Sequence, residues 1–127
     1  MEPSRIQAID HVELEAPHAA EAALRWFYGE LAGLEEVGPA MDGQSLRFRS
    51  ARIEIRIRLV LHPKIESASV RVTIAVRSLF DTSAALDDAG LTYERVSGLM
   101  FTDRTLQVFD PAGNRIAFRQ VWDFGVV

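Results

Sequence analysis

The chain has 127 residues, of which 48% are hydrophobic, and this is enough for one globular domain with a buried core. Because the sequence has no cysteine, it excludes disulfides, thiolate metal sites and cysteine nucleophiles. The net charge of −4 is uneven, since residues 45–77 hold eight basic and two acidic residues and the remainder is acidic. That acidic remainder argues against a nucleic-acid partner.

The chain has no segment that predicts a membrane or a secretory destination. No apolar run approaches the ~20 residues that a membrane-spanning helix needs. The first five residues, MEPSR, lack the apolar core of a signal peptide. We therefore expect a cytoplasmic protein without a membrane partner.

The first half predicts a strand, a helix and three further strands. Residues 6–15 alternate between apolar and polar side chains and predict a half-buried strand. Residues 19–32 are rich in alanine and predict a helix, which Gly33 can terminate. The remaining strands are expected at residues 35–39, 44–50 and 52–61.

The second half predicts the same order of elements. A strand is expected at residues 69–76 and a helix at 79–89, with Gly90 at its end. The segment Asp110-Pro111-Ala112-Gly113-Asn114 predicts a tight turn, because proline presets φ and glycine can adopt positive φ. The strands are expected at residues 91–96, 105–109 and 115–121.

The two halves repeat each other at an offset close to sixty residues. Residues 45–50 line up with 105–110, and residues 52–56 with 115–119. In each half one helix can cover the apolar face of the sheet, while the opposite face is polar. The sequence thus predicts an α+β fold in which tandem βαβββ modules form curled mixed sheets around a polar cavity, with the helices outside.

Three segments resemble the vicinal oxygen chelate superfamily, which includes glyoxalase I, extradiol dioxygenases, fosfomycin-resistance enzymes and bleomycin-resistance proteins. They are residues 9–14 (IDHVEL), residues 23–34 (ALRWFYGELAGL) and residues 108–118, with the DPAGN turn. The resemblance covers essentially the whole chain. It implies that residues 1–127 form a single glyoxalase-like domain made of two repeats, about 1–62 and 68–127.

The resemblance also implies where a metal ion would bind. Metal-dependent members place one ligand on the first and one on the last strand of each module, and these positions map to His11, Glu54, Arg71 and Ala117. A guanidinium cannot act as a ligand, and at about 4 Å it repels a divalent ion by roughly 8 kcal/mol at an effective dielectric of ~20. We therefore expect no metal cofactor, and an ion pair between Arg71 and Glu54. The alternative is a divalent ion such as zinc, nickel, iron or manganese.

The polar sheet faces hold the candidate site residues. The candidate catalytic residues are His11, Glu13 and Glu54, although His11 can instead be a hydrogen-bonded structural residue and Glu54 part of a structural ion pair with Arg71. The arginines can face solvent or bind an anion in the cavity. The candidate ligand-binding residues are Arg47, Arg49, Arg56, Arg71, Gln107 and Arg119.

Two functions remain open. The first is a metal-independent protein that binds a small polar or anionic molecule. The second is a metal-dependent or remodelled enzyme of the lyase, isomerase or dioxygenase type. Because the aromatic tail at residues 121–124 has no counterpart in the repeat, we also expect a homodimer.

Overall fold

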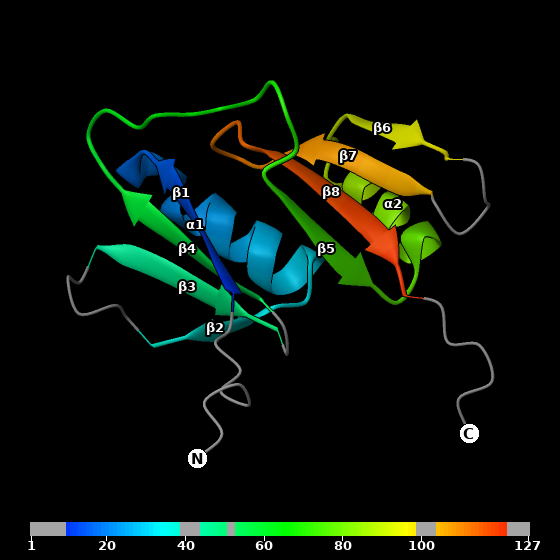
Figure 1. The fold of residues 1–127 in the computed structure, drawn as a ribbon, viewed down its shortest axis with the longest axis horizontal. Helices are drawn as coiled ribbons and strands as arrows, with labels where there is room; N and C mark the ends of the chain where they lie inside the picture. The colour runs from blue at the N-terminus through cyan, green and yellow to red at the C-terminus, as the bar shows by residue number, and fades with distance from the viewer. Residues whose placement is uncertain (1–9, 39–43, 51–52, 99–103, 122–127) are drawn as a thin grey trace, which may run out of the picture.

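The computed structural model describes residues 10–38, 44–50, 53–98 and 104–121, and within them each half has the predicted order of elements (Figure 1). The first module consists of β1 (Asp10–Ala16), η2 (His18–Ala20), α1 (Glu21–Leu24), η3 (Arg25–Leu31), β2 (Glu35–Val37), β3 (Ser45–Arg49) and β4 (Ile53–Leu59). The second consists of β5 (Val72–Val76), α2 (Leu79–Asp88), β6 (Tyr93–Val96), β7 (Thr105–Phe109) and β8 (Arg115–Gln120). Parts of four predicted segments lie outside the described residues, namely residues 6–9, residue 39, residue 52 and the aromatic tail from Trp122.

Each module forms one mixed four-stranded sheet. The first sheet has the order β1-β4-β3-β2 and the second has the order β5-β8-β7-β6. The first strand of each module runs parallel to the last, and the other pairs are antiparallel. The two sheets lie side by side, and the segment after β4 crosses from one to the other (Figure 1). The α+β fold of two repeats predicted from the sequence is thus confirmed.

The apolar face of each sheet packs against helices in one shared core. Phe48, Ile55 and Ile57 of the first sheet are fully buried, as are Ile116 and Phe118 of the second. Burial of each such side chain contributes about 1.5–3 kcal/mol. The ring of Phe27 in η3 lies 5.9 Å from that of Phe118, so the first module's helix also packs on the second sheet.

The predicted helix at residues 19–32 is irregular. A 3₁₀ turn and a single α-helical turn lead into η3, a π-helix of seven residues. The amide of Ala32 donates to the carbonyl of Phe27 at 2.9 Å, which is the i→i+5 spacing of such a helix. Phe27 and Tyr28 are both fully buried, and the wider helix allows these neighbours in sequence to face the core together. Gly33 then ends the helical segment with φ of 77°.

Among the described residues, no helix combines the length and hydropathy needed to cross a bilayer.

Candidate functional site

The face of the first sheet that lies opposite the helices carries most of the charged candidates. Strand register aligns them in two rows across the sheet. His11, Glu54 and Arg49 form one row on β1, β4 and β3. Glu13, Arg56 and Arg47 form the next row on the same three strands. The alternation of charged and apolar residues in the sequence therefore places these side chains together on one surface.

Glu54 lies at the centre of three arginines, and we call these four residues the arginine cluster. Arg47 donates to the carboxylate from Nε at 3.0 Å and from Nη2 at 3.3 Å, and Arg56 donates from Nε at 2.7 Å. The Nε atom of Arg49 lies 3.8 Å from the same carboxylate. The Glu54 side chain is only 7% exposed, so guanidinium groups take the place of water around it.

These contacts determine the ionisation of Glu54. Hydrogen bonds from Arg47 and then Arg56 lower the pKa of its carboxyl to about 2. Burial of the carboxylate raises its pKa, but this effect is smaller than that of the arginine hydrogen bonds. One carboxylate neutralises one of three guanidinium groups, so the arginine cluster carries a net charge of +2.

The predicted ion pair between Arg71 and Glu54 is wrong. Arg71 instead pairs with Glu66, with Nη1 at 2.5 Å from Oε1, and its amide donates to the carbonyl of Arg115 before β5 begins. The register shows the cause. His11 lies opposite Glu54, whereas Thr73 lies opposite Ala117. The residue of β5 that is equivalent to His11 is therefore Thr73, at an offset of 62 residues. The sequence repeat predicted an offset of sixty, which gives Arg71 instead.

His11 and Glu13 lie next to the arginine cluster on β1. Both side chains are about half exposed, at 47% and 54%, and His11 Nε2 lies 4.0 Å from Glu13 Oε2. Neither residue contacts Glu54 through a hydrogen bond or ion pair within the described part of the chain. They are the accessible acid-base groups of this surface.

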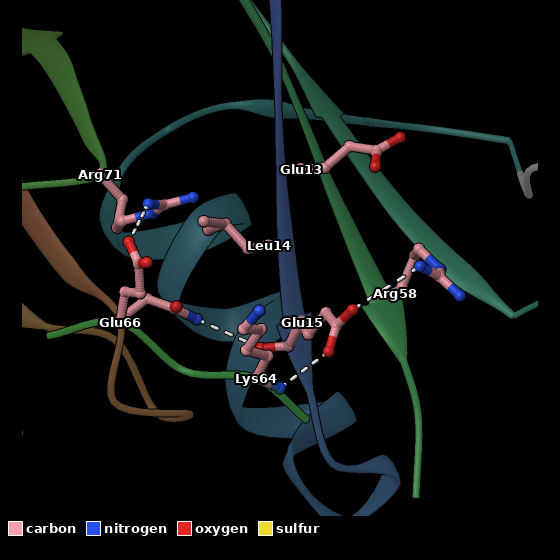
Figure 2. Close-up of a pocket in the computed structure, with 8 residues that line it drawn as sticks. Glu13, Leu14, Glu15, Arg58, Lys64, Glu66 and Arg71 are labelled. Carbon is pink, nitrogen blue, oxygen red and sulfur yellow. Dashed lines mark hydrogen bonds and ion pairs between the residues drawn. The ribbon is translucent and has the colours of Figure 1, made fainter. Parts of the chain in front are cut away.

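A pocket of about 200 Å³ adjoins this surface at the junction of the modules (Figure 2), and we call it the junction pocket. Figure 2 shows Arg58 directed to Glu15, at 3.6 Å, and Arg71 directed to Glu66. The amide of Lys64 also donates to Glu15, at 2.7 Å. The lining residues are Glu13, Leu14, Glu15, Arg58, Lys64, Glu66, Arg71 and Asn114.

The other candidates lie on the second sheet, outside the arginine cluster. Gln107 lies opposite Ala117, and Arg119 lies opposite Thr105. Ala117 is buried and offers only a methyl group. The candidate ligand-binding residues are therefore divided between two surfaces, with Arg47, Arg49 and Arg56 together and Gln107 and Arg119 apart from them.

Lys64 and Glu66 in the junction pocket were missed because they lie between the repeats, in a segment without periodicity. The clustering of Arg47 and Arg56 around Glu54 could have been found. Only three residues separate β3 from β4 in the sequence, and so short a connection predicts the antiparallel pair in which Arg49 lies opposite Glu54.

No group of three or more histidine, cysteine, aspartate or glutamate side chains within the described ranges could hold a metal ion.

No family model matches the chain, and no curated protein matches it either. Solved structures do match. A protein from Bacillus anthracis that is assigned to the glyoxalase family is 27% identical, with a TM-score of 0.74, and the match covers 92% of this chain and 97% of that one.

Two further solved structures carry descriptions of what they do. The fosfomycin resistance protein from Listeria monocytogenes is 12% identical, with a TM-score of 0.71, and the match covers 92% of this chain and 95% of that one. An antibiotic binding protein from Streptomyces sp. CB03234 is 19% identical, with a TM-score of 0.65 and coverage of 91% and 98%. At these identities the likeness concerns the fold alone.

Proposed function

The chain has the fold of the vicinal oxygen chelate superfamily, as its sequence predicted, and from this premise we propose that it binds a small polar or anionic molecule beside a degenerate metal site. The ligand contacts the arginine cluster and extends toward the junction pocket. No metal ion takes part in binding.

The observation that carries this proposal is the charge of the arginine cluster. Three guanidinium groups surround one carboxylate whose pKa is about 2, so two positive charges remain uncompensated at any physiological pH. Arginine presents paired N–H donors that match carboxylate and phosphate oxygens. An anionic ligand therefore relieves the repulsion among the arginines.

Arg49 gives a second reason. Its Nε atom is buried and has no hydrogen-bond partner within the described residues. A buried donor without an acceptor costs about 1–3 kcal/mol. A bound anion that draws the side chain away from Glu54 would let this group find an acceptor. Two relatives by fold are described as a fosfomycin resistance protein and an antibiotic binding protein, which is in keeping with a small-molecule ligand.

The proposal is tested by thermal-shift measurements at constant ionic strength with phosphate, sulfate, oxalate, malonate and citrate. We expect at least one of these anions to raise the melting temperature in a saturable way. Replacing Arg56 with glutamine should weaken that binding about tenfold, because a charged hydrogen bond is lost.

The matched control is Arg77→Gln, which removes an exposed arginine that lines neither the arginine cluster nor the junction pocket. Equal binding by the Arg56→Gln and Arg77→Gln variants would reject the arginine cluster as the site. So would a protein that none of the five anions stabilises.

The second candidate is an enzyme in which His11 or Glu13 acts as a base. The observation that favours it is that both side chains are accessible beside the arginine cluster. Glu54 is a poor base, because its pKa is about 2. Elemental analysis of the purified protein tests the metal-dependent form of this candidate, since a stoichiometric divalent metal would favour a lyase, isomerase or dioxygenase.

The functional unit we propose is a homodimer. Among the described residues, no helix covers the polar face of either sheet (Figure 1), and Phe109 on the second sheet is 47% exposed. A second copy can cover these faces and enclose the ligand. Light scattering at micromolar concentration should give twice the 14.2 kDa of one chain, and a monomer mass would contradict this.

A further inference from the structure

A pocket on the second module shares no residue with the arginine cluster or the junction pocket. It has a volume of about 390 Å³ and lies where the first turn of α2 meets β6, β7 and β8. This volume is within the range of small-molecule sites. Its principal lining residues are Leu79, Phe80, Arg95, Arg104, Leu106 and Gln120.

One wall of this pocket is apolar. Leu79 and Leu106 belong to the core and are almost fully buried. Phe80 follows Leu79 in the first turn of α2 and is 78% exposed, which is high for a large aromatic side chain. Exposed apolar residues are common on protein surfaces, but this one lies at the edge of a cavity and can cover an apolar ligand.

Two arginines supply the charge. Arg95 and Arg104 both line the pocket, and neither has an ion-pair partner among the residues that the structure describes. The guanidinium of Arg95 lies over the ring of Tyr93, at 5.6 Å from its centroid. This cation–π contact orients the group and leaves its N–H donors available.

Gln120 adds a neutral donor. Its Oε1 accepts the amide hydrogen of Leu79 at 3.1 Å, so the other end of the side-chain amide is Nε2, which is a donor. The pocket therefore combines two uncompensated cations and one amide donor with an apolar wall.

We propose that this pocket binds a small organic carboxylate with an apolar body, such as an aryl or branched aliphatic acid. The guanidinium groups bind the carboxylate and the apolar wall covers the body. An inorganic anion would leave the wall of Phe80 and Leu106 in contact with water. A neutral ligand would leave two cations unpaired.

The test uses phenylacetate as the probe and phenylacetamide as its neutral counterpart, with binding followed by NMR titration of the full chain. We expect phenylacetate to bind in a saturable way. Phenylacetamide should bind at least about tenfold more weakly, because it cannot form the charged hydrogen bonds. Arg95→Gln and Arg104→Gln should each weaken phenylacetate binding about tenfold.

Phe80→Ala should weaken binding of phenylacetate while leaving that of acetate unchanged, because only the contact with the apolar body is lost. The matched control Arg77→Gln removes a nearby exposed arginine that does not line the pocket, and it should bind phenylacetate as the wild type does. The amide NMR spectrum of each variant shows whether that variant is folded.

The proposal is overturned if phenylacetate does not saturate the protein, if phenylacetamide binds equally well, or if the double variant Arg95→Gln with Arg104→Gln retains full affinity. None of these residues belongs to the arginine cluster. A failure here is therefore distinct from a failure of the anion tests on Arg56.

Discussion

The hydroxyl of Tyr28 donates a hydrogen bond of 2.6 Å to Asp110, which lies 82 residues away in the other module. Asp110 also accepts from the amides of Ala112 and Asn114, so one carboxylate shapes the turn before β8 and binds the first module's helix. Burial raises the pKa of both side chains. The pair joins the two repeats through a polar contact inside the shared core.

We predict that Tyr28→Phe lowers the free energy of unfolding by about 1–3 kcal/mol, because the buried Oδ2 atom of Asp110 loses its shorter hydrogen bond and keeps only the one of 3.3 Å from Asn114 Nδ2. Urea denaturation measures the change. Tyr93→Phe is the control, since Tyr93 packs at the edge of the core and makes no hydrogen bond to a carboxylate among the described residues. Equal stability of the two variants would show that the inter-module hydrogen bond contributes nothing.

The second prediction concerns acid stability. The pKa of Glu54 is lowered to about 2 in the folded protein, from an ordinary value of 4.5. Between these two pKa values the unfolded chain binds a proton at Glu54 that the folded protein does not. The ionised Glu54 therefore contributes stability that is fully present above pH 4.5 and is lost as pH falls toward 2. Asp110 has the opposite sign, because its pKa is raised and folding there favours the protonated form.

Replacing Glu54 with glutamine removes the contribution of Glu54 to the pH dependence of stability and keeps that of Asp110. We expect this variant to be about 1–3 kcal/mol less stable at pH 7, because three guanidinium groups lose their counter-charge. The difference from the wild type should shrink as pH falls from 5 to 2. Urea denaturation of both proteins across this pH range measures the difference in free energy of unfolding. A difference that stays constant would mean that the arginines do not lower the pKa of Glu54.

The third prediction concerns metal ions. The arginine cluster carries two uncompensated positive charges next to His11, so the wild type should bind zinc or nickel only weakly. Replacing Arg47, Arg49 and Arg56 with glutamine frees Glu54 and should raise nickel affinity about tenfold or more, measured by calorimetry.

Two controls accompany this metal test. Adding Glu54→Gln to the triple variant should abolish the gain. Arg71→His, which changes a residue paired with Glu66 and out of register with Ala117, should leave metal affinity unchanged. Tight, stoichiometric zinc in the wild type, bound through His11 and Glu54, would contradict the degenerate site.

The fourth prediction compares two glycines. Gly113 has φ of 102° in the turn before β8, and a Cβ there would lie 3.4 Å from Ile65. Gly113→Ala should cost about 1–2 kcal/mol, because that backbone conformation is strained for alanine. Gly29 lies in η3, where a Cβ would lie 4.0 Å from Phe48. Gly29→Ala should therefore keep or raise stability, by up to about 1 kcal/mol. Thermal unfolding of both variants distinguishes them.

Local patterns in the sequence determined the repeat, the alternation of each strand and the position of the DPAGN turn. Alternation decides which residues share a sheet face, and proline and glycine decide where a turn can form. The two βαβββ modules, the buried faces of β3, β4, β7 and β8, and the polar face with Glu54 all follow from these short-range constraints.

Only the tertiary structure decided which residues contact one another. Cross-strand register depends on the lengths of loops that differ between the modules, and therefore Thr73 rather than Arg71 lies opposite Ala117. Three arginines surround Glu54 because β3 and β4 lie side by side, and Tyr28 in the π-helix donates its hydrogen bond to Asp110 in the other module. Contacts between residues far apart in sequence carry no local signature, since they arise only when the two modules pack into one core.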